Sequence, residues 1–340
     1  MSVGVLLGQV GTPEAPTPRA VRAYLARFLS DRRIVDYPAW LWQPLLRGVI
    51  LPFRARRSAR LYQRIWTAEG SPLLVESERQ RAALQVALGA GYRVVLGMAY
   101  AGPTFEKAID DLLADGIDDV IVLPMFPQYS SATTASVYDA VFASATDRAG
   151  SARRLVPTLR CVQPYYDHPG YIDALRKRIE DTIAAGDPPD HVVLTFHGLP
   201  ERYVNDGDPY RVHCNRTVDA LTAAMQWRPS DYTVAFQSRF GPEKWLGPST
   251  AEILKGLNAR GVTRPLVVAP GFTTDCLETL DELGNEGREE FAEGGGEPSR
   301  YRICPCLNDQ PEWIQAMVQL VSAPKMSRDP RFYKPHSTKS

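Results

Sequence analysis

The sequence predicts an α/β protein built from two similar lobes that face each other across a cleft. Short apolar runs alternate with amphipathic stretches along the chain, which is typical of parallel sheets covered by helices on both faces. At 340 residues, the chain is expected to form two lobes rather than one compact core. The two halves also resemble each other, because residues 120–126 and 266–272 are both apolar runs that reach proline and end in phenylalanine.

The predicted strands are short apolar runs that divide equally between the two halves, with a boundary near residues 150–159. They span residues 3–9, 93–100, 120–125, 154–159, 191–197, 233–237, 266–270 and 301–304. The predicted helices are the amphipathic stretches between these strands. They span residues 18–29, 72–88, 105–114, 133–146, 171–184, 212–225, 249–259, 277–291 and 311–320.

These elements suggest limits for the parts of the chain. The first lobe is predicted to occupy residues 1–155, and the second lobe is predicted to occupy residues 156–309. Residues 310–322 are expected to form a helix that packs back on the first lobe. Residues 323–340 are polar, basic and contain proline, so this tail is expected to lack fixed structure.

Charge and composition narrow the classes of function. The 39 basic residues balance the 39 acidic residues, which removes any global argument for a nucleic-acid partner. No apolar run approaches the roughly 20 residues of a membrane-spanning helix, and the first residues are typical of a strand rather than a signal peptide. The five cysteines are an odd number in a long chain, so no disulfide scaffold is expected. These features predict a cytoplasmic protein that is not integral to a membrane.

Two short motifs indicate what the lobes are not expected to bind. Residues 97–102 match neither the dinucleotide-binding pattern nor the phosphate-loop pattern, so no nucleotide is expected. Cys304 and Cys306 are too close in sequence for the usual zinc or iron–sulfur arrangements, and no second cysteine pair accompanies them. We therefore interpret these two cysteines as structural.

A histidine lies where one predicted strand stops. His197 closes the strand at residues 191–197, and Gly198 and Pro200 then make a tight exit that could aim its ring at the cleft. Ligands of open α/β sheets collect outside the carboxyl ends of the strands, which makes His197 a candidate site residue. The alternative is a histidine whose hydrogen bonds are satisfied near the core. The other histidines fall in loops or polar surroundings and are predicted to lie at the surface.

A row of carboxylates follows the strand that ends near Pro270. Glu278, Glu282 and Glu286 are four residues apart and share one face of the predicted helix at residues 277–291. One interpretation is an ordinary solvated face. The other is functional, since like charges repel unless cations or protons pass along them. A histidine facing such carboxylates could accept protons or hold a divalent metal.

An apolar segment precedes a cluster of arginines in the first half. Residues 39–53 are rich in tryptophan, leucine and phenylalanine, and the chain then carries Arg54, Arg56, Arg57 and Arg60. This pattern suits an element that lies at a membrane surface against anionic headgroups. It equally suits a pocket for a flat apolar ligand that bears carboxylates, or an internal helix with a charged flank.

Taken together, these motifs resemble the ferrochelatase family, whose members insert ferrous iron into a porphyrin to make haem. The resemblance covers roughly residues 3–321, with the motifs in order and at compatible spacing. The segments that carry it include residues 4–13, 28–33, 65–73, 127–130, 196–200, 207–210, 236–241, 245–248, 270–272, 275–280 and 306–308.

The resemblance implies a fold, a reaction and catalytic residues. The family fold has two Rossmann-like lobes with a porphyrin cleft between them. His197 takes the position of the invariant histidine, and Glu278 takes that of the essential glutamate. Glu282 and Glu286 continue the acidic ladder, so these four residues are the expected metal-contacting set. Fe²⁺ is then a substrate, and the cysteine-rich extension that binds a [2Fe–2S] cluster in some members is absent, so no cluster is expected.

The resemblance also implies how the porphyrin is bound. The segment at residues 40–53, named the lip below, is expected to cover the porphyrin and to touch the inner face of the cytoplasmic membrane. The expected partners are the porphyrin substrate and the haem product, without nucleic acid. The expected porphyrin-binding residues are Gln9, Val10, Arg64, Tyr100, Tyr129, Ser130, Trp245 and Phe272.

The resemblance leaves three hypotheses open, and two departures from the family pattern motivate the last of them. Gln9 stands where the family usually has asparagine, and Ala99 stands where it usually has arginine. The leading hypothesis is a ferrochelatase that acts on protoporphyrin IX. One alternative is an enzyme that acts on coproporphyrin III, whose four carboxylates should require a more basic and open cleft. The other alternative is a relative that binds porphyrin or haem without inserting metal.

Overall fold

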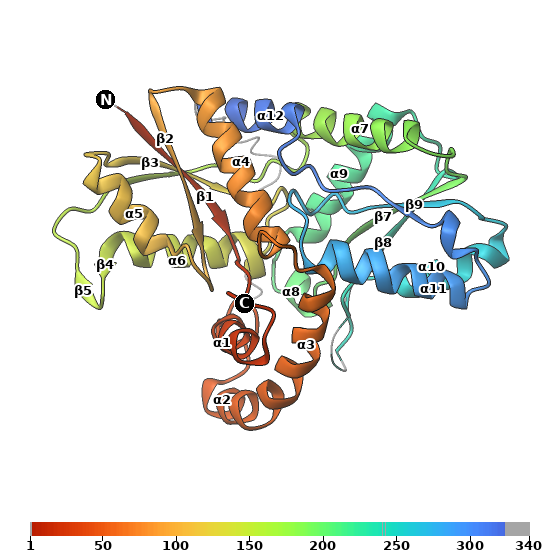
Figure 1. The fold of residues 1–340 in the computed structure, drawn as a ribbon, viewed down its shortest axis with the longest axis horizontal. Coiled ribbons are helices and arrows are strands. Elements are labelled where there is room, and N and C mark those ends of the chain that lie inside the picture. The colour runs from red at the N-terminus through yellow and green to blue at the C-terminus, as the bar shows by residue number, and fades with distance from the viewer. Residues whose placement is uncertain (1, 240, 242, 324–340) are drawn as a thin grey trace, which may run out of the picture.

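Two four-stranded parallel sheets form the framework of the computed structural model, which describes residues 2–239, 241 and 243–323. The first sheet has the order β2-β1-β3-β6 and the second has the order β10-β9-β7-β8 (Figure 1). The predicted α/β class with four parallel strands in each half is therefore confirmed. The strands are β1 Val3–Gln9, β2 Tyr92–Met98, β3 Asp119–Pro124, β6 Thr158–Cys161, β7 His191–His197, β8 Tyr232–Gln237, β9 Pro265–Val268 and β10 Arg302–Ile303.

The fourth strand of the first sheet was predicted in the wrong place. The apolar residues Leu155 and Val156 suggested a strand at residues 154–159, but both side chains are exposed. Pro157 cannot donate a hydrogen bond to a neighbouring strand, and β6 begins just after it. A short hairpin, β4 Asp147–Arg148 and β5 Ser151–Ala152, precedes this point and was not predicted.

Helices cover both sheets, and several begin with proline in their first turn, where its missing N–H costs nothing. In the structure, residues 39–53 form α2, a π-helical segment and the start of α3, whereas the sequence predicted no separate helices there. The α-helices are α1 Pro18–Phe28, α2 Ala39–Leu45, α3 Leu51–Ile65, α4 Pro72–Leu88, α5 Phe105–Ala114, α6 Ser136–Thr146, α7 Pro169–Ala184, α8 Glu201–Asn205, α9 Tyr210–Met225, α10 Thr250–Leu257, α11 Gly287–Glu293 and α12 Pro311–Ser322.

Five short helical segments of other types complete the described chain. Two are 3₁₀ turns, η3 Asn258–Arg260 and η5 Pro298–Arg300. Three are π-helical, namely η1 Leu46–Ile50, η2 Ser131–Ala135 and η4 Glu278–Glu286. The π-helix is rare and frequently occurs at functional sites. All three π-helical segments lie in or beside segments that are predicted to form the site or the lip.

One hydrophobic core runs through both halves of the molecule. It contains Leu7 and Leu123 from the first sheet together with Leu194 and Val268 from the second. Smaller clusters lie on the other face of each sheet. Helix α12 packs against both α4 and α7, which lie beside it in Figure 1. The two sheets are therefore joined by continuous packing, and the residue limits of the lobes stay a prediction.

The carboxyl ends of the strands bring distant segments together. In the second sheet, His197 at the end of β7 is in register with Gln237 at the end of β8. In the first sheet, Gln9 at the end of β1 is in register with Met98 at the end of β2. The loops that follow these ends carry most of the candidate site residues, which agrees with the usual placement of ligands in such folds.

Candidate active site

His197 is held in one tautomer at the end of β7. Its Nδ1 lies 2.7 Å from the carbonyl oxygen of Gly198. Because a carbonyl oxygen only accepts hydrogen bonds, Nδ1 must carry the proton, which leaves Nε2 of the neutral ring free to accept one. A side chain on Gly198 would meet the carbonyl oxygen of Gln237 at 2.6 Å, so only glycine allows this close exit from the strand.

The acidic row lies on a π-helix rather than on the α-helix predicted at residues 277–291. The structure has η4 over Glu278–Glu286, followed by α11. Packing against Tyr301 favours the wider turn: its hydroxyl donates a hydrogen bond to the carbonyl oxygen of Leu283 at 2.6 Å. A side chain on Gly287 would lie 2.5 Å from the same hydroxyl oxygen. Tertiary contacts of this kind leave no periodic signal in the sequence.

Glu282 is tied to the strand end beside His197. Its Oε2 accepts hydrogen bonds from Ser238 Oγ at 2.5 Å and from Gln237 Nε2 at 3.3 Å. Ser238 adopts a left-handed backbone conformation with φ of 64°, which is uncommon for serine and marks a constrained position. Burial raises the pKa of Glu282, whereas the Ser238 hydrogen bond lowers it. These hydrogen bonds therefore hold Glu282 at the end of β8, whose last residue Gln237 is in register with His197.

Glu278 begins the row and faces the first half of the molecule. Burial raises the pKa of Tyr24 in α1, and the charge of Glu278 raises it further. It also contributes to the raised pKa of Tyr62 in α3. The carbonyl oxygen of Glu278 accepts a hydrogen bond from Gln237 Nε2 at 3.4 Å. Glu278 thus lies between the strand end that carries His197 and the helices that lead into and out of the lip.

A buried network of hydrogen bonds holds the start of this π-helix. The carboxylate of Asp275 accepts hydrogen bonds from Asn308 Nδ2 at 2.7 Å and from Thr279 Oγ1 at 3.0 Å. In return, Asn308 Oδ1 accepts the backbone N–H of Asp275 at 2.9 Å. Gln80 of α4 adds a link to the first half by donating to the carbonyl oxygens of Thr273 and Asn308. The position of Glu278 is therefore fixed from both halves of the chain.

The acidic row extends one residue further than predicted. Glu290 in α11 follows Glu286 at the same spacing of four. Burial raises the pKa of Glu290 to about 7; Lys255 opposes this rise, whereas Glu286 and Glu282 add to it. Burial also raises the pKa of Glu286. The spacing was visible in the sequence, but the partial burial of Glu290 was not.

Glu290→Gln should change how stability depends on pH. A carboxyl whose folded-state pKa is raised contributes most below its ordinary value of 4.5, and this contribution is lost as the pH rises to about 7. The variant should therefore show a smaller fall in the free energy of unfolding between those two pH values. The exposed neighbour Glu289 provides the control Glu289→Gln. Identical pH slopes of the free energy for the wild type and Glu290→Gln would contradict this assignment.

Arg64 was expected to pair with porphyrin carboxylates, but it already has a protein partner. Its Nε lies 2.7 Å from Oδ1 of Asp281, whose side chain is only 1% exposed. Asn285 donates a further hydrogen bond to the same oxygen at 2.8 Å. Arg64 therefore links α3 to the π-helix and supplies the counter-charge of a buried carboxylate.

Arg64→Met should lower the free energy of unfolding by about 2–3 kcal/mol, because it would leave Asp281 buried without a cation; the partial exposure of Arg64 keeps this below the loss for a fully buried pair. Urea unfolding of the wild type and the variant measures the difference. Arg60→Met, at an exposed position of the same helix, should stay within about 0.5 kcal/mol of wild type. Equal losses in both variants would show that Asp281 does not depend on Arg64.

Gln9 and Tyr100, both expected at the porphyrin, have protein partners inside the fold. Gln9 is 3% exposed, and its Nε2 donates to Thr274 Oγ1 at 3.2 Å. The hydroxyl of Tyr100 donates to Asp31, and its ring meets Phe28 edge-on. These contacts give both side chains a role in holding the walls of the site. The half-buried Val10 packs against the main core.

The remaining candidates lie around the strand ends of both halves. Trp245 lies next to Gly198, and its backbone bridges to Pro200, so it is a neighbour of His197. Its buried indole Nε1 has no hydrogen-bond partner among the described residues. Ser130 donates to Asp208 Oδ2 at 3.2 Å, whereas the half-buried Phe272 packs against the smaller core cluster of the second sheet.

His213 lies beside the candidate residue Tyr129, although the sequence predicted it at the surface. It lies in α9 and is half-buried, and its Nδ1 accepts the backbone N–H of Tyr129 at 3.1 Å. The ring stacks on Tyr166 with 4.0 Å between centroids. Burial lowers the pKa of His213 to about 4, so the ring is neutral at pH 7 and can accept this hydrogen bond. His191 was also expected at the surface, but it is buried and bonded to Thr233.

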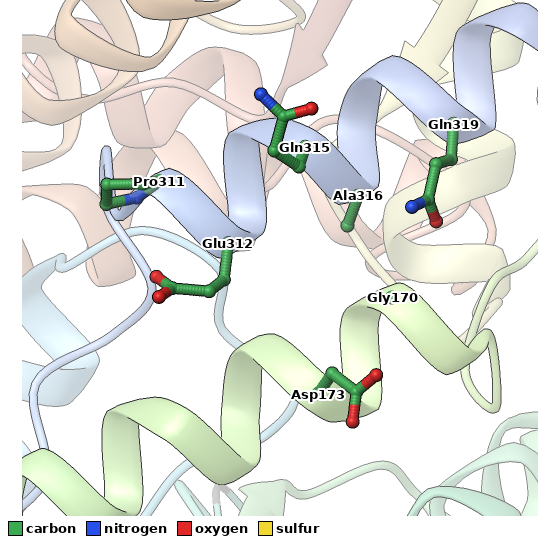
Figure 2. A pocket seen from close by; sticks show the side chains of 7 residues that line it. All are labelled: Gly170, Asp173, Pro311, Glu312, Gln315, Ala316 and Gln319. Carbon is green, nitrogen blue, oxygen red and sulfur yellow. The ribbon is translucent and has the colours of Figure 1, made fainter.

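No closed metal cage is present in the part of the chain that the structure describes. No group of three or more histidine, cysteine, aspartate or glutamate side chains is gathered there to hold an ion. Two shallow pockets lie elsewhere, and neither is lined by a candidate site residue. One of them, with a volume of about 370 Å³, lies where Gly170 and Asp173 of α7 face Glu312, Ala316 and neighbouring residues of α12 (Figure 2).

The two-sheet framework is similar in fold to solved structures of chelatases. The structure of SirB from Bacillus subtilis with Fe³⁺ matches with a TM-score of 0.54 and 12% identity, over 95% of this chain and 96% of that one. The sirohydrochlorin chelatase SirB from Bacillus subtilis subspecies spizizenii, in complex with cobalt, matches with a TM-score of 0.55 and 11% identity, over 94% of both chains. At this level of identity the likeness shows the fold alone.

Sequence comparison identifies the family. The ferrochelatase family pattern matches residues 2–324. The ferrochelatase of Pectobacterium atrosepticum is 48% identical over 318 residues, which cover 94% of this chain and 97% of the relative. The ferrochelatase of Edwardsiella ictaluri is 49% identical over 320 residues, with the same coverage. The chain belongs to the ferrochelatase family.

Proposed function

We propose that this protein inserts Fe²⁺ into protoporphyrin IX, forming haem and releasing the two pyrrole protons. Membership of the ferrochelatase family supports the reaction class. The observation that carries the proposal for this site is that His197, whose Nε2 is free to accept a proton, ends β7 in register with Gln237, which donates a hydrogen bond to the half-buried carboxylate of Glu282. His197 and Gln237 stand at the carboxyl ends of neighbouring parallel strands, where ligands usually bind in open α/β sheets.

In the proposed mechanism, His197 is the general base. The free-base porphyrin must lose its pyrrole protons as the metal enters, and a neutral imidazole accepts a proton readily near pH 7. Glu278 and Glu282 stabilise the imidazolium that forms, because carboxylates close to it favour its charged form. Glu286 and Glu290 extend the row away from His197 and provide acceptors along which protons can leave.

The acidic row is also the proposed contact for the incoming metal. His197, Glu278, Glu282 and Glu286 offer nitrogen and oxygen donors on one side of the site, and Fe²⁺ accepts both types. As a substrate, the ion must then pass from these donors to the porphyrin.

The porphyrin is proposed to lie against the apolar and aromatic side chains at the strand ends. Trp245 packs next to Gly198, the residue that follows His197, so its ring lies near the proposed base. Val10, Tyr129 and Phe272 supply further surface on which a flat macrocycle can pack. Because Arg64 is paired with Asp281, we assign it to the wall of the site rather than to the porphyrin carboxylates.

The lip is proposed to rest on the inner face of the cytoplasmic membrane. Trp40 and Phe53 are 79% and 77% exposed, and Leu41, Leu45 and Val49 between them are exposed as well. Figure 1 shows α2 and the start of α3 projecting away from both sheets. Apolar side chains edged by arginines suit the boundary between headgroups and acyl chains. None of the described helices is long and apolar enough to cross a membrane.

Replacing both Trp40 and Phe53 by aspartate should lower the fraction of protein that sediments with anionic liposomes by at least about fivefold, since apolar burial and electrostatic attraction would both weaken. Val86→Asp is the matched control, because Val86 is 83% exposed on α4, outside the lip. Liposome association that is unchanged in the double variant would confine the lip to a role in the cleft wall.

Anaerobic mixing with Fe²⁺ and protoporphyrin IX tests the proposed reaction. The porphyrin fluorescence should disappear over many turnovers while the absorption of haem appears. Porphyrin that binds stoichiometrically without turnover would instead place the protein among porphyrin carriers. In that case Gln9→Asn and Ala99→Arg, which restore the usual family residues, would be the first variants to examine.

A further inference from the structure

We propose that Arg202 is a positioning residue that fastens the base of the lip to the strand end carrying His197. The proposal rests on the proposed function, since it concerns how the lip is held over the same site. Arg202 lies in α8, just after the exit of β7 through Gly198 and Pro200. Its partners Asp36 and Tyr37 lie immediately before α2, the first helix of the lip.

The guanidinium of Arg202 binds two carboxylates that are far apart in sequence. Its Nη1 and Nη2 donate to the two carboxylate oxygens of Asp36 in a bidentate pair. Its Nε donates to Glu243 Oε2 at 2.8 Å. A planar guanidinium can make both contacts at once, which a lysine ammonium cannot do with the same geometry.

Aromatic side chains complete the group, which we name the Arg202 clasp (Asp36, Tyr37, Arg202, Tyr203 and Glu243). The Tyr37 hydroxyl donates to Glu243 Oε1 at 2.5 Å. The Tyr203 hydroxyl donates to the carbonyl oxygen of Ile34 at 3.2 Å. The guanidinium carbon lies 4.5 Å from the Tyr203 ring centroid and 5.8 Å from that of Tyr37, within the range of cation–π attraction.

The two carboxylates of the Arg202 clasp are charged at neutral pH, as ion pairing with Arg202 requires. The Arg202 hydrogen bonds lower the pKa of Asp36. The Tyr37 hydrogen bond, and then the Arg202 hydrogen bond, lower the pKa of Glu243. Both carboxylates are therefore ionised at neutral pH.

The position of the clasp links two borders of the site. Glu243 is two residues before Trp245, whose backbone bridges to Pro200 beside His197. Asp36 and Tyr37 lead directly into the lip. A porphyrin that enters or leaves beneath the lip would require this part of the chain to move away from Trp245. The clasp resists that movement, so it should slow the departure of bound porphyrin.

The clasp is also weak enough to open. The side chains of Arg202 and Asp36 are 38% and 40% exposed, and ion pairs of this exposure contribute modestly and are screened by salt. A fully buried pair would instead hold the lip shut. The geometry therefore fits a fastening that yields during each binding event.

The test compares Arg202→Ala with a matched ion-pair control. Arg160 and Asp119 form a bidentate pair between β6 and β3 at 2.9 and 2.8 Å, with side chains 45% and 43% exposed. Arg160→Ala therefore removes a similar pair that is remote from the lip in sequence. The dissociation rate of protoporphyrin IX is measured by stopped-flow fluorescence after mixing the complex with excess albumin as a trap.

We expect Arg202→Ala to raise the dissociation rate about three- to tenfold, in line with the modest contribution of exposed ion-pair networks, and Arg160→Ala to leave it unchanged. Added NaCl should speed dissociation from the wild type but not from Arg202→Ala. The dissociation rate of Arg202→Lys should lie between the rates of the wild type and Arg202→Ala, because lysine keeps the charge without the bidentate geometry.

Amide hydrogen exchange gives a readout that needs no porphyrin. The N–H groups of α2 should exchange faster in Arg202→Ala than in Arg160→Ala or the wild type, with the sheets unchanged. Equal exchange and equal dissociation rates in the two alanine variants would overturn the clasp. If the wild type bound no porphyrin, the proposed function would fail, whereas the exchange comparison would still decide whether Arg202 holds the lip.

Discussion

His197→Ala should lower the rate of metal insertion by at least about a hundredfold, the usual contribution of a well-placed general base. Protoporphyrin binding should remain within about threefold of wild type, because the aromatic surface around Trp245 is untouched. The rate is measured in single turnovers with Zn²⁺ or anaerobic Fe²⁺, and binding is measured by fluorescence titration. The split between the two quantities separates a lost base from a lost binding site.

A control for this variant lies at the other end of the same strand. His191 begins β7, where its Nε2 lies 2.9 Å from Thr233 Oγ1, remote from the acidic row. His191→Gln should therefore retain a near wild-type insertion rate in the folded protein. If His197→Ala also kept more than about half of the rate, His197 would have no part in the proton transfer.

Glu278→Gln should lower kcat about a hundredfold with little change in the KM for porphyrin. The substitution keeps the size of the side chain but removes the charge that acts on Glu282, Tyr24 and Tyr62. Loss of a carboxylate that stabilises the imidazolium should appear in kcat, because that charge develops only during the reaction. Steady-state rates over a range of porphyrin concentrations measure both parameters.

Two further variants separate a charge effect from a packing effect at this position. Glu278→Asp keeps the carboxylate one methylene further back and should recover part of the rate. Glu289→Gln removes a carboxylate from the exposed side of α11 and should leave the rate unchanged. A loss in Glu278→Asp as large as that in Glu278→Gln, together with a changed KM, would point to packing rather than charge.

The apolar runs in the sequence were enough to predict most of the strands, and with them the α/β fold. Largely buried parallel strands such as β1, β3 and β7 appear in the sequence as nearly continuous apolar runs, which are easily recognised. His197 was found because it ends such a run. The strand at residues 154–159 was misplaced because exposed Leu155 and Val156 imitate a buried run. Apolar character predicts a strand only where the surrounding packing buries it.

The finer geometry of the site depends on contacts between distant segments. The π-turns of η4 depend on Tyr301, and the pairing of Arg64 depends on Asp281. The link of Arg202 to Asp36 joins residues 166 positions apart. No local pattern records such pairs, so the sequence suggested Arg64 for the porphyrin and gave no sign of the clasp. The residue types of the acidic row were predictable, but the helix type that presents them was not.

The most direct test of the account is the ratio of kcat/KM for anaerobic Fe²⁺ insertion into protoporphyrin IX and into coproporphyrin III, measured side by side. We expect turnover on protoporphyrin IX and a preference of at least about tenfold, because the exposed apolar lip and the paired Arg64 disfavour two additional carboxylates. A preference for coproporphyrin III would contradict the assigned substrate, and tight binding without turnover on either porphyrin would contradict the proposed reaction.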